Sequence, residues 1–416
     1  MRSIIAFVLL ATATPVSAQT FTTLASFKGP DGTPPYLGSL VQGKNGNLYG
    51  TALQGGNKSN SGTVFEASLT GQIVPLYKFC SQPNCADGAD PNSSLVLASS
   101  GNFYGTTQLD GAYRSHGTVF KVAVSGTLTT VHSFCQSLTS RGYCTDGSNP
   151  TSPLVEATNG DLYGEAPIGG DSDGGTIFAM TPAGDFHTIY QFCLQVGCLD
   201  GVDPTGGLMQ ASNGNFYGVA GAGGSGNGGT VFQITPEGAF TSLYSFCNQT
   251  NHGVCRDGDQ PNTALVQATD GNLYGTTMQG GVFTKNCTYA SSCGTVFLIA
   301  PTGAFSTLYT FCVQSNCPDG KAPTGTLIQA SDGNLYGTAS AGGAMQSGTV
   351  FKLTPQGVLT VLHSFCTQPP QCADGLGPVG GLVQASNGVL YGTTVRGGAY
   401  NQGTIYSLTL SYSSSH

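Results

Sequence analysis

The sequence predicts an all-β protein, a seven-bladed β-propeller built from four-stranded antiparallel blades. A motif with the core LYG or FYG recurs seven times along the chain, and its tyrosines lie 54 to 62 residues apart. Each copy holds four short runs rich in Val, Ile, Thr, Tyr and Phe, and the two chain ends supply complementary parts of one copy. A repeat of this length made of short strands is typical of a ring or stack of small sheets. The anchor tyrosines are Tyr49, Tyr104, Tyr163, Tyr217, Tyr274, Tyr336 and Tyr391.

The sixth copy, residues 324–365, shows the expected elements in order. We expect its strands at 327–330, 335–338, 348–353 and 359–365. The first turn contains Gly333, which accepts a positive φ, beside Asp332 and Asn334, which favour tight turns. The runs LIQA and TVFKL are apolar at nearly every position, so both faces of each sheet should be covered, as in blades packed face to face.

The chain ends indicate that the ring closes. The last copy stops after the strand at 403–408 and lacks a fourth strand, whereas residues 19–27 at the other end match one. We therefore expect the N-terminal strand to complete the last blade and to remove an exposed edge. An open β-solenoid is the alternative, but it would need polar capping repeats at both ends. The predicted propeller covers residues 19–410.

Residues 1–18 read as a signal peptide. Arg2 provides a positive start, residues 4–10 form an apolar stretch too short to span a bilayer, and residues 16–18 provide a small-residue cleavage site. Residues 411–416 form a polar tail. We expect a secreted or periplasmic, soluble and monomeric protein without a transmembrane segment.

The composition narrows the choice of partners. Only 8% of the residues are charged and the net charge is −8, so a nucleic-acid partner, which needs a basic surface, is excluded. The sequence contains no phosphate loop, dinucleotide fingerprint, nucleophile elbow or HExxH zinc motif. We expect no cofactor and no metal.

Fourteen cysteines in an exported chain predict disulfides. They fall into seven local pairs, because six pairs recur just after the fourth strand run and one lies in an insertion of the fifth copy. The pairs are Cys80/Cys85, Cys135/Cys144, Cys193/Cys198, Cys247/Cys255, Cys287/Cys293, Cys312/Cys317 and Cys366/Cys372.

In an antiparallel blade, the loops between the second and third strands and the blade-to-blade connections lie on one side of the disc. This side carries every cysteine, and we call it the disulfide-bearing face; the opposite side, with short uniform turns, is the short-turn face. Variable loops on a rigid scaffold usually carry function, so we expect binding on the disulfide-bearing face. A recurring Asp-Gly on this face has two readings: a turn-shaping aspartate, which we favour, or a calcium site at Asp87/Asp90 and Asp200/Asp203.

Departures from the repeat provide the candidate binding residues. The second copy has Asp110, Arg114 and His116 in a loop that is usually uncharged, the third has Glu165 where most copies have Thr, and the seventh has Arg396. Asp171 and Asp173 follow in the third copy. On neighbouring blades these side chains could converge and supply acid, base and cation for sugar chemistry. The alternative is ordinary solvated loop charge, which we favour.

The recurring aromatic positions suit packing. His132 and His363 occupy a strand position that holds Tyr in four other copies, which favours a packing role with a polar tip. The LYG tyrosines should pack between blades, although sugar binding by a ring of tyrosines stays open.

The chain resembles the GloVer tandem-repeat family of exported bacterial proteins. The resemblance rests on segments such as DGNLYGTTMQGG (270–281), SGTVFKLTPQG (347–357) and TVLHSFC (360–366), and it covers essentially all of the mature chain. Members often carry a C-terminal surface anchor, and from the polar tail at 411–416 we expect none here. The resemblance implies the fold and no particular activity.

The leading functional hypothesis is a non-enzymatic binding or scaffold propeller that meets an extracellular glycan or protein on its disulfide-bearing face. The competing hypothesis is a polysaccharide lyase or glycoside hydrolase that uses Glu165, His116, Asp110 and Arg114 as catalytic groups. A purely structural envelope protein, which neither binds nor turns over a glycan, is the third class.

Overall fold

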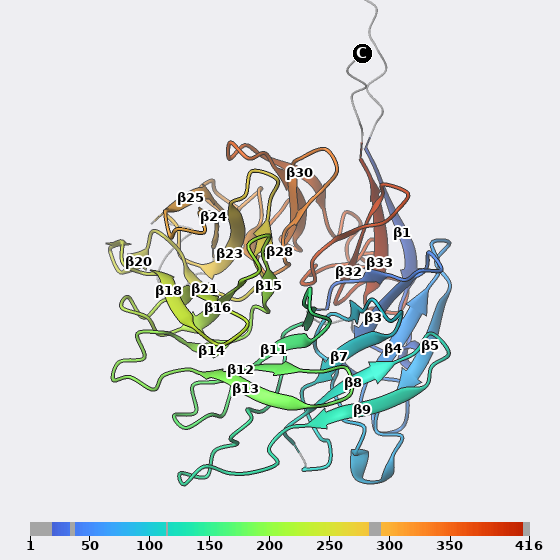
Figure 1. Cartoon of the computed structure of the whole chain (residues 1–416). Coiled ribbons are helices and arrows are strands. Elements are labelled where there is room, and N and C mark those ends of the chain that lie inside the picture. The colour runs from blue at the N-terminus through green and yellow to red at the C-terminus, as the bar shows by residue number, and fades with distance from the viewer. Residues whose placement is uncertain (1–18, 34–37, 114, 283–292, 411–416) are drawn as a thin grey trace, which may run out of the picture.

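The computed structural model describes residues 19–33, 38–113, 115–282 and 293–410. Seven antiparallel sheets stand around a central axis like the blades of a propeller, as predicted (Figure 1). The predicted signal peptide at 1–18, the tail 411–416, Arg114 and Cys287 lie outside the described residues. No helix in the described part of the chain has the length and apolar character needed to cross a bilayer.

The first three blades have one strand for each expected run. Blade 1 contains β2 (Val41–Gln42), β3 (Leu48–Ala52), β4 (Thr63–Ala67) and β5 (Ile73–Lys78). Blade 2 contains β6 (Val96–Leu97), β7 (Phe103–Thr107), β8 (Thr118–Val122) and β9 (Leu128–Ser133). Blade 3 contains β10 (Val155–Glu156), β11 (Leu162–Ala166), β12 (Thr176–Met180) and β13 (Phe186–Gln191).

In blades 4 to 6 the innermost strand is split into two short pieces that pair with the same neighbour. Blade 4 contains β14 (Val202–Pro204), β15 (Met209–Gln210), β16 (Phe216–Ala222), β17 (Thr230–Ile234) and β18 (Phe240–Ser245). Blade 5 contains β21 (Asp259–Pro261), β22 (Val266–Gln267), β23 (Leu273–Gln279), β24 (Thr295–Ile299) and β25 (Phe305–Thr310). Blade 6 contains β26 (Lys321–Pro323), β27 (Ile328–Gln329), β28 (Leu335–Ala341), β29 (Thr349–Leu353) and β30 (Leu359–Ser364).

Blade 7 is assembled from both ends of the chain. It contains β31 (Val383–Gln384), β32 (Leu390–Thr394), β33 (Thr404–Thr409) and β1 (Thr20–Ser26). β1 pairs antiparallel with β33, from Thr20 opposite Thr409 to Ser26 opposite Thr404, so the N-terminal strand closes the ring as predicted. A separate hairpin of β19 (Thr250–Asn251) and β20 (Val254–Cys255) and two 3-10 turns, η1 (Gly29–Asp31) and η2 (Pro83–Cys85), lie in connections.

The second strand of each blade carries a glycine because an aromatic ring of the adjacent strand and a Leu of the same blade pack over it. A Cβ at Gly337 would lie 2.6 Å from the ring of Phe351 and 2.7 Å from Leu327, so a larger residue would overpack the core. Seven apolar clusters of described residues fill the spaces between successive blades, including the one between blades 7 and 1. Each blade therefore buries its faces against its neighbours, and no blade has a core of its own.

The aromatic positions serve this inter-blade packing. Tyr49 lies fully buried with its ring centroid 4.3 Å from that of Phe103 on the next blade. His132 stacks on Phe186 of the next blade at 3.8 Å, and His363 stacks on Phe21 at 3.6 Å. The histidines thus pack as the tyrosines at this position do.

The innermost strand is shorter than the sequence suggested. In blade 6 only Ile328 and Gln329 pair as a strand, although 327–330 was expected. Leu327 is buried in the core between blades 5 and 6, and the Ala330 N–H turns back to the carbonyl of Asn334. The hydrophobic run extends beyond the strand because its end residues fill the core without joining the ladder.

Candidate functional site

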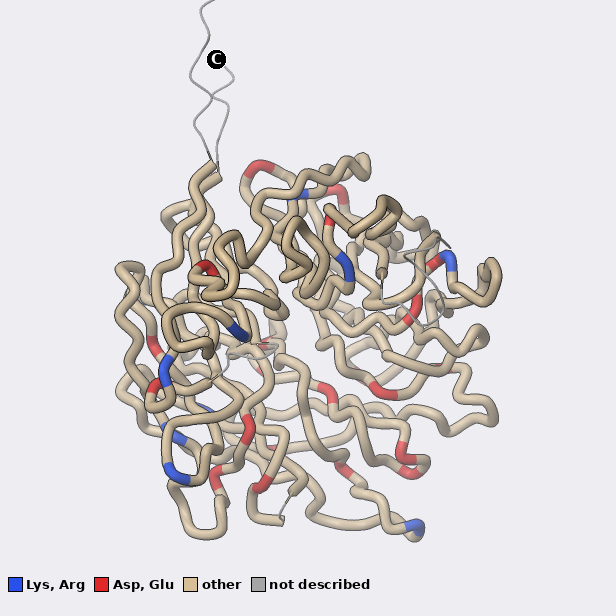
Figure 2. The backbone as a smooth tube through the Cα atoms, turned by 180° about the vertical axis from the view of Figure 1, so that it is seen from behind, with Lys and Arg blue, Asp and Glu red and all other residues tan. Residues whose placement is uncertain are grey.

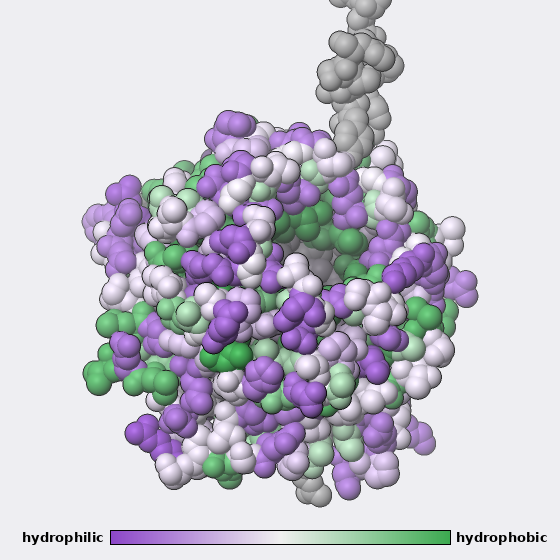
Figure 3. Space-filling model, viewed as in Figure 1, coloured by the Kyte–Doolittle hydropathy of each residue, from purple (hydrophilic) through white to green (hydrophobic). Residues whose placement is uncertain are grey.

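A cavity of about 410 Å³ lies where the connections lead into the innermost strands of five blades. In the space-filling view the molecule has a hollow near the centre of the ring (Figure 3). The walls of the cavity come from the connections that lead into blades 2 to 6 and from the ends of β16 and β23, which places it toward the disulfide-bearing face. The described lining residues are Ser93, Ser94, Thr151, Pro153, Asp203, Thr205, Gly206, Gly221, Ala222, Gln260, Asn262, Thr263, Met278, Thr324 and Thr326. Most of these side chains are hydroxyls or amides, and Asp203 is the charged residue among them.

The local sequence explains how the connection presents Asp203. Asp203 has φ 60°, a conformation that Asp and Asn tolerate better than other residues with a Cβ, and Pro204 follows it. The Asp203 N–H donates to the Gly174 carbonyl at 3.1 Å, and Pro204 packs so closely on Gly175 that a Cβ there would lie 2.5 Å from its ring. These contacts with blade 3 fix the position of the connection, and the residues that follow Pro204 line the cavity.

The Asp203 carboxylate has no protein partner. The side chain is exposed, and within the described ranges no hydrogen bond or salt bridge reaches its carboxylate oxygens. A Cβ at Gly221 would lie 3.6 Å from its Oδ2, so glycine keeps this side of the carboxylate open. Partial burial raises the pKa of Asp203, because the walls of the cavity remove water from the charged form.

Two further oxygens in the cavity wall lack partners. Asn262 Oδ1 and Thr324 Oγ1 are shielded from solvent and have no hydrogen bond. Both residues directly follow the proline of their connection, one leading into blade 5 and the other into blade 6. Buried oxygens without a partner are costly, so a ligand that repositions these two side chains can supply the missing hydrogen bonds.

Glu165, predicted as a site residue, lies behind the cavity wall. It is only 1% exposed on β11, and its Oε2 accepts a hydrogen bond from the Gly207 N–H at 2.8 Å, while Oε1 has no partner. Burial raises the pKa of Glu165 to about 8; the Gly207 bond opposes this shift and the charge of Asp203 adds to it. The structure therefore brings Glu165 together with Asp203, through the connection that forms the wall.

Asp110 and His116 lie at the two ends of one loop of blade 2. Asp110 takes the place of a loop glycine at φ 60°, and its carbonyl accepts the Gly117 N–H at 2.9 Å. In the described part of the chain, no hydrogen bond or ion pair joins Asp110 or His116 to Glu165. The charge of Asp110 instead acts on Asp90, whose pKa is raised first by burial and then by this neighbour.

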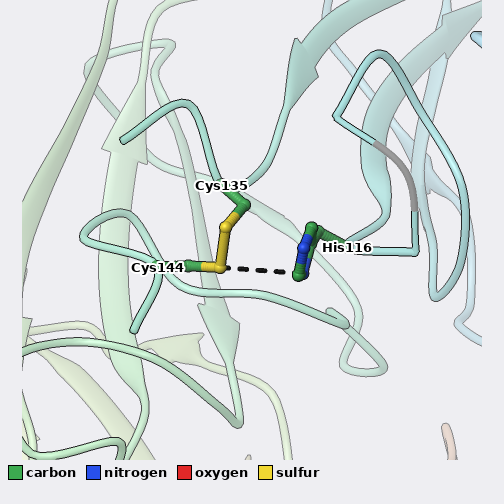
Figure 4. Close-up of side chains that lie close together, drawn as sticks. All are labelled: His116, Cys135 and Cys144. Carbon is green, nitrogen blue, oxygen red and sulfur yellow. Dashed lines mark hydrogen bonds between the residues drawn. A yellow bond between two sulfur atoms is a disulfide. The ribbon is translucent and has the colours of Figure 1, made fainter. Parts of the chain in front are cut away.

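His116 lies beside a disulfide. Its Nδ1 is 3.6 Å from Cys144 Sγ, and Cys135 and Cys144 are bonded to each other (Figure 4). The three side chains are close enough to surround a metal ion. Metal binding by cysteine needs the thiolate, however, and the disulfide consumes both sulfurs. This cluster therefore offers only an imidazole nitrogen.

The remaining predicted site residues lie apart from the cavity lining. Asp171 is exposed, and Arg396 is exposed with its backbone paired to Leu376. Asp173 Oδ1 accepts the Gly169 N–H at 2.9 Å, as Asn60 does for Gly55 at 2.8 Å, so its carboxylate closes its own loop. Arg114 is outside the described residues.

The recurring Asp-Gly aspartates bind protein donors. Asp200 accepts the Tyr190 hydroxyl at 2.8 Å and the Cys193 N–H at 3.0 Å, and Asp146 meets His132 Nε2 at 3.0 Å. Equivalent bonds link Asp87 to Tyr77, Asp257 to Tyr244, Asp319 to Tyr309 and Asp374 to His363. The aspartate thus ties each disulfide loop to the outer strand, which agrees with the turn-shaping interpretation.

Six of the predicted disulfides form as local pairs: Cys80–Cys85, Cys135–Cys144, Cys193–Cys198, Cys247–Cys255, Cys312–Cys317 and Cys366–Cys372.

Of the seventh predicted pair, Cys287 with Cys293, the structure describes only Cys293. Cys293 is fully buried in the core between blades 5 and 6, and its sulfur is engaged in a disulfide. Its predicted partner Cys287 lies outside the described residues. The oxidised state of Cys293 therefore agrees with the prediction, whereas its pairing with Cys287 stays a prediction.

Sequence reasoning missed the cavity and its acceptors Asn262 and Thr324, and considered Asp203 only as a calcium ligand. The sequence did contain an indication of this site: the residue type before the proline of each blade-to-blade connection differs between the copies. The residue before the proline is Asp90, Asn149, Asp203, Gln260, Ala322 or Gly377. Because this position varies in an otherwise regular repeat, the fold does not require a particular side chain there, and the position is available for binding.

Comparisons with known proteins agree with the repeat and the fold. The Gloeobacter/Verrucomicrobia repeat model matches residues 10–197, 136–289 and 251–416. No curated protein matches the chain. Among solved structures, a streptogramin B lyase has a TM-score of 0.58 at 13% identity, over 96% of this chain and 100% of the other.

Two other solved structures give similar values. Virginiamycin B lyase from Staphylococcus aureus has a TM-score of 0.56 at 13% identity, over 94% of this chain and 99% of that one. The extracellular domain of a putative hybrid two component system from B. thetaiotaomicron has a TM-score of 0.54 at 13% identity, over 94% of this chain and 41% of the other. At such low identity these similarities show the propeller fold alone.

Proposed function

The chain belongs to the Gloeobacter/Verrucomicrobia repeat family, and from this premise we propose that it is an exported binding propeller whose axial cavity holds part of an extracellular glycan. The observation that carries the proposal is the cavity of about 410 Å³ lined by hydroxyl and amide side chains from five successive blades. Ligand sites are concave, commonly about 300–1,000 Å³, and contain a few converging polar groups. The protein acts as a secreted or periplasmic monomer in this proposal.

The donors and acceptors of the wall suit a polyhydroxylated ligand. Ser93, Thr205 and Thr326 offer hydroxyls, and Gln260 and Asn262 offer amides. Such groups both donate and accept hydrogen bonds, as sugar hydroxyls do. The cavity surface is also partly apolar, with Met278 its largest apolar side chain, and this part can meet the carbon face of a sugar ring.

The scaffold keeps these loops in place. The disulfides close short loops beside the cavity connections, and the Asp-Gly aspartates bind these loops to the outer strands. Preorganised loops lose less conformational entropy when a ligand binds, which lowers the free-energy cost of binding. Six local disulfides also fit an oxidising compartment.

A glycoside hydrolase or lyase is the second candidate, because the charge of one carboxylate, Asp203, acts on a second, Glu165, beside the cavity. A protonated Glu165 would suit a general acid. Its side chain is 1% exposed, however, so a reacting glycan could touch it only after the Thr205–Gly207 wall moved. Binding without turnover is therefore the function that the geometry supports best.

A cavity-filling variant tests the proposal. We expect Ala222→Trp, which places a large ring in the cavity, to abolish retention on a panel of immobilised glycans. Val124→Trp is the matched control, because Val124 is 54% exposed in a turn of the short-turn face and should leave binding intact. Equal retention of both variants, or no retention of the unaltered protein on any glycan, would contradict the proposal. Release of reducing ends that Glu165→Gln abolishes would establish the hydrolase instead.

A further inference from the structure

The Asp203 carboxylate is the charged group of the axial cavity, and nothing in the described chain neutralises it. Its oxygens receive no hydrogen bond, and both ion pairs of the described residues, His132–Asp146 and His363–Asp374, lie elsewhere. Comparable aspartates on the same face, such as Asp200 and Asp257, each bind a tyrosine hydroxyl at 2.8 Å. A carboxylate without a partner at the wall of a cavity favours an incoming positive charge.

The cavity contains no positive side chain that could satisfy Asp203 or attract an anion. No Lys, Arg or His is among its described lining residues. Among the described residues, Lys and Arg are few and lie on other parts of the ring (Figure 2), and the whole chain carries a net charge of −8. An acidic glycan would therefore meet a carboxylate and no counter-charge, which is unfavourable.

Two other residues of the cavity wall have an unpaired oxygen. Asn262 and Thr324 line the same cavity as Asp203, and Asn262 Oδ1 and Thr324 Oγ1, shielded from solvent behind its surface, have no hydrogen bond. A protonated amine carries only donors, and the neighbouring hydroxyls of a sugar ring can donate as well. The unpaired carboxylate of the wall, together with its amide and hydroxyl side chains, matches a sugar that carries an ammonium group.

We propose that the axial cavity selects glycans with a free, protonated amino group over neutral and acidic glycans, and that Asp203 is the residue that makes this selection. The inference rests on the proposed glycan-binding function and names its ligand class. Asp203 binds the ammonium group, while the amide and hydroxyl side chains on the connections into blades 5 and 6 bind the flanking donors of the ligand.

The test compares three soluble oligosaccharides of one length by calorimetry at neutral pH in the presence of EDTA. They are an oligomer of glucosamine, the same oligomer with every amine acetylated, and an oligomer of galacturonic acid. We expect the glucosamine oligomer to bind about tenfold or more tightly than the acetylated one, which is the effect of a charge-assisted hydrogen bond. The galacturonic acid oligomer should bind most weakly.

Two variants assign the preference to Asp203. Asp203→Asn should reduce the affinity for the glucosamine oligomer to that for the acetylated oligomer. The variant should fold, because Asn149 occupies the same position of another connection at φ 55°. Glu237→Gln is the matched control: Glu237 is an exposed acid of the same blade, in a turn of the short-turn face, and its change should leave both affinities unaltered.

The outcomes separate the inference from the proposed function. Equal or tighter binding of the acetylated or acidic oligomer, or no effect of Asp203→Asn, would overturn the amine selection and leave glycan binding standing. Binding that appears only when calcium or magnesium replaces EDTA would assign Asp203 to a metal ion and overturn the inference. Absence of binding by every oligosaccharide in every buffer would overturn both.

Discussion

The buried carboxyl of Glu165 accepts a hydrogen bond from the Gly207 N–H, with Oε2 and the nitrogen 2.8 Å apart. Glu165 belongs to the second strand of blade 3, and Gly207 belongs to the connection that leads into blade 4. In blades 1 and 6 the equivalent position holds Thr51 and Thr338, whose hydroxyls donate to the carbonyls of Ser93 and Gly380 in the next connection. Blade 3 thus reverses the usual bond: here the strand side chain accepts, and the connection donates.

This reversal predicts an unusual pH dependence of stability. Because the pKa of Glu165 is raised to about 8 in the folded state, the unfolded chain loses this proton first as the pH rises. The contribution of Glu165 is fully present below its unfolded pKa of about 4.3 and is lost as the pH rises toward 8, by at most about 1.4 kcal/mol per pH unit. Glu165→Gln should flatten the melting temperature between about pH 5 and pH 8. The measurement is the melting temperature of both proteins as a function of pH, by thermal unfolding. Parallel curves for the variant and the unaltered protein would contradict this expectation.

Asp257 should be among the more sensitive polar residues of the loops. It is 1% exposed and accepts the Tyr244 hydroxyl at 2.8 Å and the Asn248 N–H at 3.2 Å. Asp257→Ala should lower the free energy of unfolding by about 2–3 kcal/mol, because the Tyr244 hydroxyl and the Asn248 N–H lose their buried acceptor. Tyr244→Phe removes only one hydroxyl and should cost about 1 kcal/mol. Denaturant unfolding measures both values, and a larger loss for Tyr244→Phe would contradict the assignment.

The closing strand should control the stability of the whole ring. Phe21 on β1 stacks on His363 of blade 6 at 3.6 Å and packs on Tyr406 of β33 at 5.3 Å. Phe21→Ala should lower the free energy of unfolding by about 3 kcal/mol, since it removes a ring from the junction of the two chain ends. Thr22→Ala on the same strand, at an exposed position, serves as control and should change it by less than about 0.5 kcal/mol. Equal effects in chemical denaturation would show that β1 does not support the closure.

The strand glycines should resist substitution for a packing reason. Gly337→Ala places a methyl group 2.6 Å from the Phe351 ring, and we expect a loss of about 1–3 kcal/mol in unfolding free energy. The additional change Phe351→Leu should recover part of this loss by making room. Gly29→Ala, where no atom lies within 4 Å of the added carbon, should be nearly neutral. A double variant less stable than Gly337→Ala alone would exclude a steric cause.

Local and periodic features of the sequence were enough to predict the scaffold. The tyrosine repeat predicted seven blades, the incomplete last copy predicted that β1 would pair with β33, and the Cys80–Cys85 type of spacing predicted local disulfides. These predictions held because the strands, the turns and the short loops depend on residues close in sequence. The innermost strands were harder, since Leu327 fills the core without joining the ladder.

The candidate site was less accessible to such reasoning. Glu165 stood out because it replaces Thr, but the sequence suggested Asp110 and His116 as its partners on a neighbouring loop. The structure instead places it against the connection that carries Asp203, on the other side of its blade. The repeat specifies that blades adjoin, while the direction in which each side chain points depends on strand register and on the path of the connection.

The amino-acid sequence by itself determined the number of blades, their strand order and the way the ring closes, because each follows from a hydrophobic pattern repeated along the chain. Only the tertiary structure decided that Asp203, Asn262 and Thr324 line one cavity while Glu165 lies buried behind its wall. The physical reason is that an axial cavity takes its walls from connections of several blades, and their spacing in space is set by packing between blades and by no local pattern.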